Sequence, residues 1–206
     1  MHSNRLAGLR GSGLIPLLLL ATLMPGCALF REEAVLAPAS AEARQSLYAL
    51  TNWRMEGRIG AQTAEDSWHA NLFWEHDSTQ DRLRVSGPLS QGMISIVLQK
   101  DLIYINEGHG VTQLSNDPDA MLRERLGFAV PLASLRYWIL GVPDPNMESA
   151  VIPAEGNSPG GFQQSGWVVR MDNYMNAGNH AMPRKMRVQG SGVKLKIIAD
   201  NWEIKG

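Results

Sequence analysis

The sequence has 206 residues, of which 44% are hydrophobic and 19% charged, with a formal net charge of −1. This length fits a single domain with a core of its own. The near-neutral charge argues against nucleic-acid binding, which typically requires a strongly basic chain. The single cysteine excludes a disulfide within the chain, and the five histidines show no zinc-ligand spacing, so we expect no metal site.

The first predicted element is an apolar run from Leu14 to Cys27 that follows two arginines. Residues 1–26 contain no Asp or Glu. A basic start and an apolar stretch of about ten residues that ends at a small residue are typical of a secretory signal peptide. The run is shorter than the roughly 20 residues that a membrane-spanning helix needs.

Gly26-Cys27 at the end of this run resembles the lipobox of bacterial lipoproteins. The resemblance implies that Cys27 carries N-acyl and S-diacylglycerol groups, and that Ala28 behind it directs the protein to the outer membrane. The alternative is a secreted chain with one unmodified cysteine. We therefore expect a signal peptide (1–26), a lipid-anchored tether (27–40) and one domain (41–206). The tether contains Pro38, and its apolar residues follow no sustained helix or strand periodicity.

The domain begins with a predicted helix from residue 41 to about 52, since Ala43, Leu47 and Leu50 share a face. Apolar and polar residues then alternate with a period of two, which predicts strands. These strands are expected at 53–62, 66–75, 81–87, 93–100, 102–106 and 111–115.

Two helices are predicted next, at about 116–126, which starts with a cap and Pro118 and stops before Gly127, and at 131–141. Further strands follow at 161–164, 166–172, 182–189 and 193–202. Consecutive short strands interrupted by helices indicate an α+β fold in which helices pack on one face of a large antiparallel sheet.

No arrangement of residues in the sequence indicates an enzyme. The sequence has no GxSxG elbow and no P-loop, and carboxylate pairs such as Glu65-Asp66 occur in predicted turns. The sequence leaves open the alternative that two carboxylates from distant strands form a catalytic pair. The unusual feature is the turn Gly87-Pro88-Leu89, where glycine and proline force a reversal with a leucine near its tip. A leucine there either folds inward or points out towards a membrane.

Several segments together resemble the LolB family, the outer-membrane receptors for lipoproteins in Gram-negative bacteria. They are Trp53 with Gly57-Arg58, the turn at 87–89, SLRYWILGVP at 134–143, GW at 166–167, AMP at 181–183 and KLKIIADNW at 194–202. The resemblance covers essentially the whole predicted domain. It implies a strongly curved antiparallel sheet that forms an incomplete barrel, with helices closing its open side over a hydrophobic cavity.

The family resemblance also implies the function. Such a receptor, expected to be a monomer, takes triacylated lipoproteins from the periplasmic carrier LolA and places them in the inner leaflet of the outer membrane. A leucine on a protruding loop is needed for release into the membrane lipid, and it matches Leu89, in the loop with Gly87 and Pro88. Because the sequence shows no nucleotide site, we expect transfer without ATP and no cofactor besides the acyl groups on Cys27.

No motif marks the cavity, so its lining is predicted from the faces of the strands and helices. The candidates are Leu72, Trp74, Ile94, Ile96, Leu98, Leu135, Trp138 and Ile139. The same residues could equally form a solid core, as in a structural or assembly-accessory lipoprotein of the outer membrane. A soluble LolA-like carrier is disfavoured by Cys27, and a lipid hydrolase lacks a visible nucleophile arrangement.

Overall fold

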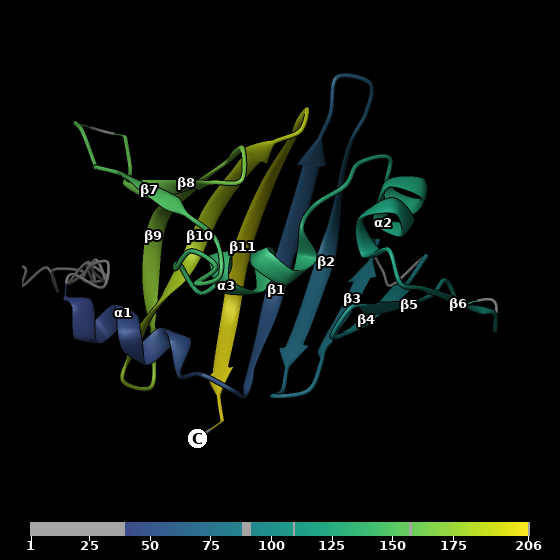
Figure 1. Ribbon diagram of the computed structural model, residues 1–206, viewed down its shortest axis with the longest axis horizontal. Helices are drawn as coiled ribbons and strands as arrows, with labels where there is room; N and C mark the ends of the chain where they lie inside the picture. Colours follow the sequence, from purple (N-terminus) through teal and green to yellow (C-terminus); the bar gives the residue numbers. More distant parts are fainter. Residues whose placement is uncertain (1–39, 88–91, 109, 157, 206) are drawn as a thin grey trace, which may run out of the picture. The chain divides into compact units, whose positions relative to one another are not determined.

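The computed structural model describes residues 40–87, 92–108, 110–156 and 158–205, all within one compact unit, Glu33–Gly206. These residues form three helices and one sheet of eleven antiparallel strands (Figure 1). The elements are α1 (Ala41–Tyr48), β1 (Trp53–Gln62), β2 (Ser67–His76), β3 (Asp81–Ser86), β4 (Ile94–Gln99), β5 (Leu102–Asn106), β6 (Thr112–Ser115), α2 (Pro118–Leu126), α3 (Leu132–Trp138), β7 (Ser149–Ile152), β8 (Gly161–Gln164), β9 (Trp167–Ala177), β10 (His180–Gly190) and β11 (Val193–Ile204).

The sheet consists of two meanders that meet in its middle. The strand order is β6-β5-β4-β3-β2-β1-β11-β10-β9-β8-β7, so the first long strand pairs with the last one. The β1–β11 register runs from Trp53 opposite Ile204 to Gln62 opposite Lys194. Strands β6 and β7 are the two edges of the described sheet, which is open.

A glycine permits the closest backbone approach at the centre of the sheet. The β1–β11 register shifts between Glu56 and Gly57, and a Cβ on Gly57 would lie 2.0 Å from the carbonyl oxygen of Ile198. No side chain fits there, which explains a glycine in the middle of a long strand.

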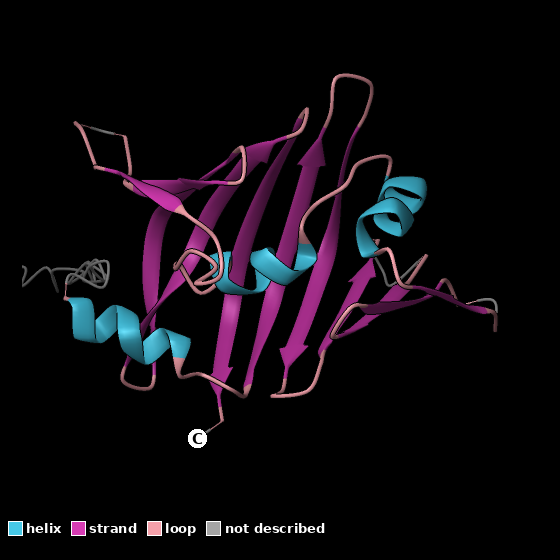
Figure 2. Cartoon of the chain, in the orientation of Figure 1, coloured by secondary structure: helices cyan, strands magenta, loops and turns pink. Residues whose placement is uncertain are grey.

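The two faces of the sheet differ in polarity. The inner face carries alternate apolar side chains, such as Met55, Leu72 and Ile197, which are buried in the core. The insertion between the two meanders packs on this face, and α3 crosses the sheet in front of β1 and β11 (Figure 2). The outer face carries the intervening polar side chains, such as Arg58 and Lys196.

The predicted α+β class, the antiparallel sheet and the two insertion helices are confirmed. Strand β7 was not predicted, because its four residues lie at an edge and lack an alternating burial pattern. The first helix ends at Tyr48 rather than near Asn52, because the Leu50 N–H bonds to the carbonyl of Leu47, three residues back, and no longer continues the helical pattern. Within the described ranges no helix is long and apolar enough to cross a membrane.

Candidate functional site

An apolar cavity of about 50 Å³ lies between the inner face of the sheet and the insertion. Its strand-derived lining consists of Ile59, Trp68, Leu72, Trp74, Leu83, Val85, Ile96, Leu195 and Ile197. The insertion contributes Leu122, Leu126, Phe128, Val130, Leu132 and Leu135. Every lining residue is apolar, so the cavity offers no directional bond to a ligand and suits only hydrocarbon.

Simple periodicities in the sequence produce this lining. Residues two apart on a strand, such as Leu195 and Ile197, point to the same face. Leu122 and Leu126 are four apart on α2 and therefore share one side of that helix. Gly127 ends α2 in the left-handed conformation with φ 81°, which turns the chain towards the segment before α3.

The size of the cavity decides what it can hold. An engineered apolar cavity of about 150 Å³ takes up one benzene molecule. The volume here is about a third of that, so the described conformation leaves no room for an acyl chain. A long hydrocarbon can enter only if part of the lining moves.

One end of α3 is bonded to the sheet through a buried carboxylate. Asp81 on β3 is 1% exposed, and its Oδ1 accepts from Trp74 Nε1 at 3.0 Å and lies 3.0 Å from His76 Nδ1. Its Oδ2 accepts from Arg136 of α3 at 3.4 Å. This charge-assisted contact ties α3 to β2 and β3.

A second buried network connects α3 to β8. Gln164, also 1% exposed, accepts from Trp138 Nε1 at 2.7 Å and from the Asp144 N–H at 2.9 Å. Its amide nitrogen donates to the carbonyls of Asp144 and Met147. Ser134 of α3 donates to Asp144 Oδ2 at 2.8 Å. The four buried polar residues of the described chain, Asp81, Ser134, Asp144 and Gln164, thus all take part in positioning α3.

Helix α2 has no comparable buried bond. Leu122 is buried and Leu126 half-buried against the cavity, and both contacts are apolar. Its polar side-chain links to the sheet run through Arg125, which donates to Gln113 of β6 and lies 3.4 Å from Glu107. Glu107 is exposed, and surface ion pairs of this kind contribute about 1 kcal/mol or less.

Four predicted cavity residues line the observed cavity: Leu72, Trp74, Ile96 and Leu135. Leu98, Trp138 and Ile139 lie in the buried core outside this lining, and Ile94 packs against that core. The strand alternation could have indicated Ile59, Leu83, Val85, Leu195 and Ile197, but the segment 128–130 has no periodic signal. Gly87 is half-buried behind β3, whereas Cys27, Pro88 and Leu89 lie outside the described residues.

Burial and hydrogen bonding shift the pKa values of some titratable groups in the described part of the chain. No group of three or more His, Cys, Asp or Glu residues there could hold a metal ion. Burial raises the pKa of Tyr174 to about 12. Hydrogen bonds from Thr79, opposed by partial burial, lower the pKa of Asp77 in the β2–β3 turn to about 2.

The chain is similar in sequence to proteins of one known family. A family model described as "Outer membrane lipoprotein LolB" matches residues 51–202. An outer-membrane lipoprotein LolB from Thiobacillus denitrificans is 31% identical over 151 residues, which cover 73% of this chain and 80% of that protein. One from Ectopseudomonas mendocina is 28% identical and covers 78% of each chain. Among solved structures, a LolA superfamily protein from Nitrosomonas europaea has a TM-score of 0.46 at 9% identity, over 84% of this chain and 95% of that one.

Proposed function

The chain belongs to the LolB family of outer-membrane lipoproteins, and we propose that it is a receptor that binds the acyl chains of incoming lipoproteins in the cavity under α2. In this proposal a LolA-like periplasmic carrier delivers triacylated lipoproteins, and the receptor inserts them into the inner leaflet of the outer membrane. The wholly apolar lining, to which both the sheet and the insertion contribute, is the main support for this proposal.

Hydrocarbon burial supplies the driving force. Each buried methylene is worth about 0.8 kcal/mol, so one chain of about 16 carbons represents roughly 12 kcal/mol against water. Binding of this strength requires enclosure on several sides, which a sheet covered by helices provides and a flat patch does not. Transfer then needs no ATP, provided that the carrier binds the chains more weakly and the membrane more strongly.

We propose that α2 and the segment 127–131 move to admit the chains while α3 stays in place. The apolar contacts of Leu122 and Leu126 can be replaced by contacts with acyl chains at little net change in buried area. The bonds of Asp81 and Gln164 have no substitute in hydrocarbon, and leaving them unmade is costly. In this proposal the helices close over the inner face of the sheet, and the cavity between them and the sheet becomes larger when α2 moves.

Membrane attachment and release involve residues outside the described ranges. We propose that acylated Cys27 anchors the protein at the periplasmic face of the outer membrane. We also propose that Leu89, presented by Gly87 and Pro88, enters the membrane during release. The domain limits at residues 26 and 40 belong to the same proposal.

Filling the cavity tests acyl binding directly. We expect Leu126→Trp, which places a larger side chain in the lining, to reduce uptake of an acylated lipoprotein at least about tenfold, because the indole occupies part of the space that opens when α2 moves. The matched control is Leu114→Trp on β6, where the leucine is 58% exposed. Equal uptake by both variants and the unchanged protein would contradict the assignment of the cavity.

The release step is tested with Leu89→Glu. We expect this variant to fold and to accept cargo, but to retain it in the presence of membranes, because a charged side chain opposes entry into lipid. Normal insertion of cargo by this variant would show that the loop is assigned wrongly.

The small volume of the cavity favours one alternative, a structural or assembly-accessory lipoprotein of the outer membrane with a solid core. This alternative predicts that Leu126→Trp is merely destabilising and that acyl chains do not bind. Titration of the protein with a fluorescent fatty acid separates the two, since the receptor binds it and the solid core does not.

A further inference from the structure

The outer face of the sheet carries a row of cations directly opposite one another. Arg170 on β9 pairs with Arg187 on β10, and Arg187 pairs with Lys196 on β11. On its other side, Lys196 lies opposite Gly60 on β1. Because Gly60 has no side chain, nothing from that position packs over Lys196. Like charges directly opposite each other in an antiparallel pair are destabilising. Asp172 offsets Arg187, and Arg170 donates to Ser158 and Pro159, whereas Lys196 has no carboxylate partner among the described residues.

Basic residues around the row outnumber the carboxylates that neutralise them. Together with the row, Arg58, Lys185 and Lys194 form the basic patch. Asp172 is shared by Lys185 and Arg187, at 3.3 and 2.6 Å. Asp200 pairs with Arg58 at 2.8 Å. Lys194 and Lys196 make no ion pair with any described residue, and the whole chain has a net charge of −1. Within the basic patch, positive charge therefore exceeds negative charge.

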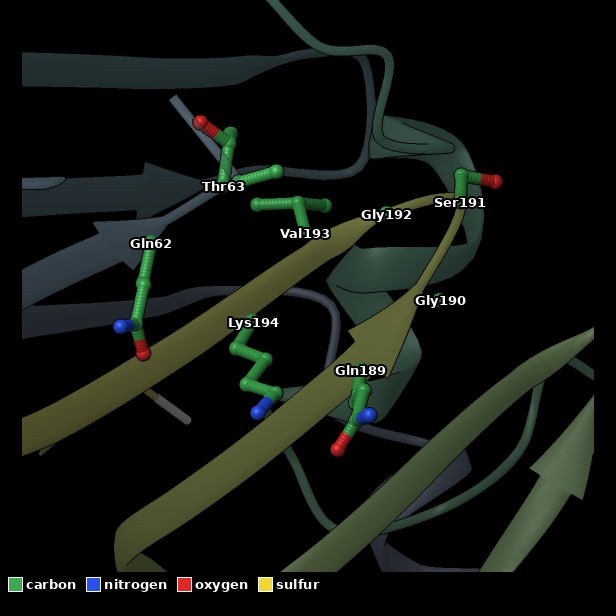
Figure 3. Close-up of a pocket in the computed structure, with 9 residues that line it drawn as sticks. Gln62, Thr63, Gln189, Gly190, Ser191, Gly192, Val193 and Lys194 are labelled. Carbon is green, nitrogen blue, oxygen red and sulfur yellow. The ribbon is translucent and has the colours of Figure 1, made fainter. Parts of the chain in front are cut away.

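Lys196 separates two hollows in the patch. One, of about 320 Å³, lies over Gly60 and is bordered by Arg58, His69 and Asn71. The other, of about 570 Å³, is bordered by Lys185, Arg187 and the β7–β8 connection, and Asp172 is the one carboxylate in its lining. Figure 3 shows the next row towards the strand ends, where Gln62, Lys194 and Gln189 project from the same face beside a third hollow.

We propose that the basic patch is a docking surface for an acidic face of another protein. Charge complementarity requires an anionic partner. Neighbouring strands are about 4.8 Å apart, so the cations present a spacing that successive carboxylate side chains can match, and the hollows give those side chains room. A bilayer is a poorer fit, because its flat surface would leave the hollows on either side of Lys196 unfilled. The patch lies on the face opposite the cavity, so this inference goes beyond the proposed function and does not depend on it.

The test measures binding of fluorescent poly-L-glutamate to the lipidated protein in micelles of a neutral detergent. We expect binding that weakens as salt rises, and a loss of at least about tenfold in affinity in Lys194→Glu/Lys196→Glu, because the reversed charges repel the probe. The control, Lys100→Glu/Arg123→Glu, makes the same change in net charge away from the patch and should bind as the unchanged protein does. Equal weakening in both double variants would overturn the proposal in favour of a non-specific charge effect.

Two further measurements complete the test. The patch variant should melt no lower than the unchanged protein, because the Lys196→Glu change places an opposite charge across from Arg187; a lower melting temperature would contradict the repulsive row. Vesicles of phosphatidylcholine with phosphatidylglycerol form the second arm. If the patch variant lost binding to these vesicles and kept its binding to poly-L-glutamate, the partner would be a membrane and the proposal would be wrong.

Discussion

Helices α2 and α3 both contribute side chains to the same apolar cavity but are attached to the sheet in different ways. Helix α3 is bonded through two buried groups. Asp81 of β3 accepts from Arg136 of α3 and from Trp74 of β2. Gln164 of β8 accepts from Trp138 of α3 and from the backbone of the segment after α3. Helix α2 contributes Leu122 and Leu126 to the cavity and makes its polar links at the surface through Arg125. One helix is therefore fixed by direction-specific bonds and its neighbour by exchangeable apolar contacts.

In the proposed mechanism, this contrast lets one insertion combine a helix that stays in place with a helix that moves. Buried hydrogen bonds require one geometry, whereas apolar contacts are non-directional and can be made with a ligand instead. If α3 moved with α2, the network of Gln164 would have to break for each cargo molecule. We therefore expect substitutions and exchange measurements to distinguish the two helices.

The largest expected effect comes from Gln164→Leu. This change leaves Trp138 Nε1, the Asp144 N–H and two carbonyls without partners in a buried site, and we expect a loss of about 3 kcal/mol in the free energy of unfolding. Urea denaturation measures it. The control is Gln163→Leu, on the same strand but exposed, which should cost less than about 0.5 kcal/mol. Equal losses would mean that the network does not fix α3.

Hydrogen exchange should show the contrast without any substitution. We expect the amides of Met121 and of the C-cap Gly127, which bond to carbonyls of the α2 segment, to exchange about a hundredfold faster than those of Leu135 and of the C-cap Ile139 of α3, because local opening of α2 breaks no buried polar bond. NMR of the protein without cargo provides the rates. Similar protection in the two helices would remove the basis for a movable α2.

A smaller, pH-dependent effect is expected beside the end of α3. Tyr174 lies next to Gly141, and burial raises its pKa from 10.0 to about 12. A raised pKa stabilises the fold fully below pH 10, and this contribution is lost as the pH rises from 10 towards 12. Thermal melts in that range should show a steeper decline for the unchanged protein than for Tyr174→Phe. Parallel declines would show that another group is responsible.

Local sequence patterns predicted most of the sheet but only part of the site. Alternation identified β2 and β11, since each buries one face, and the segments around Gly127 and Pro131 marked the helix limits. Strand β7 has no such pattern, because its first three residues are exposed at an edge. The network of Gln164 joins this residue of β8 to α3 and to the segment after α3, over separations of 17 to 26 residues. No local signal distinguishes this glutamine from the exposed Gln163.

The most direct test of the central claim is transfer of a labelled triacylated lipoprotein from its complex with a LolA-like carrier to the protein produced from Ala28 onward, without nucleotide. We expect the label to move to the receptor, and we expect Leu126→Trp to block this movement while Leu114→Trp does not. If the folded protein took up no label from the carrier, the cavity would not be an acyl-binding site, and the structural-lipoprotein alternative would replace the receptor proposal.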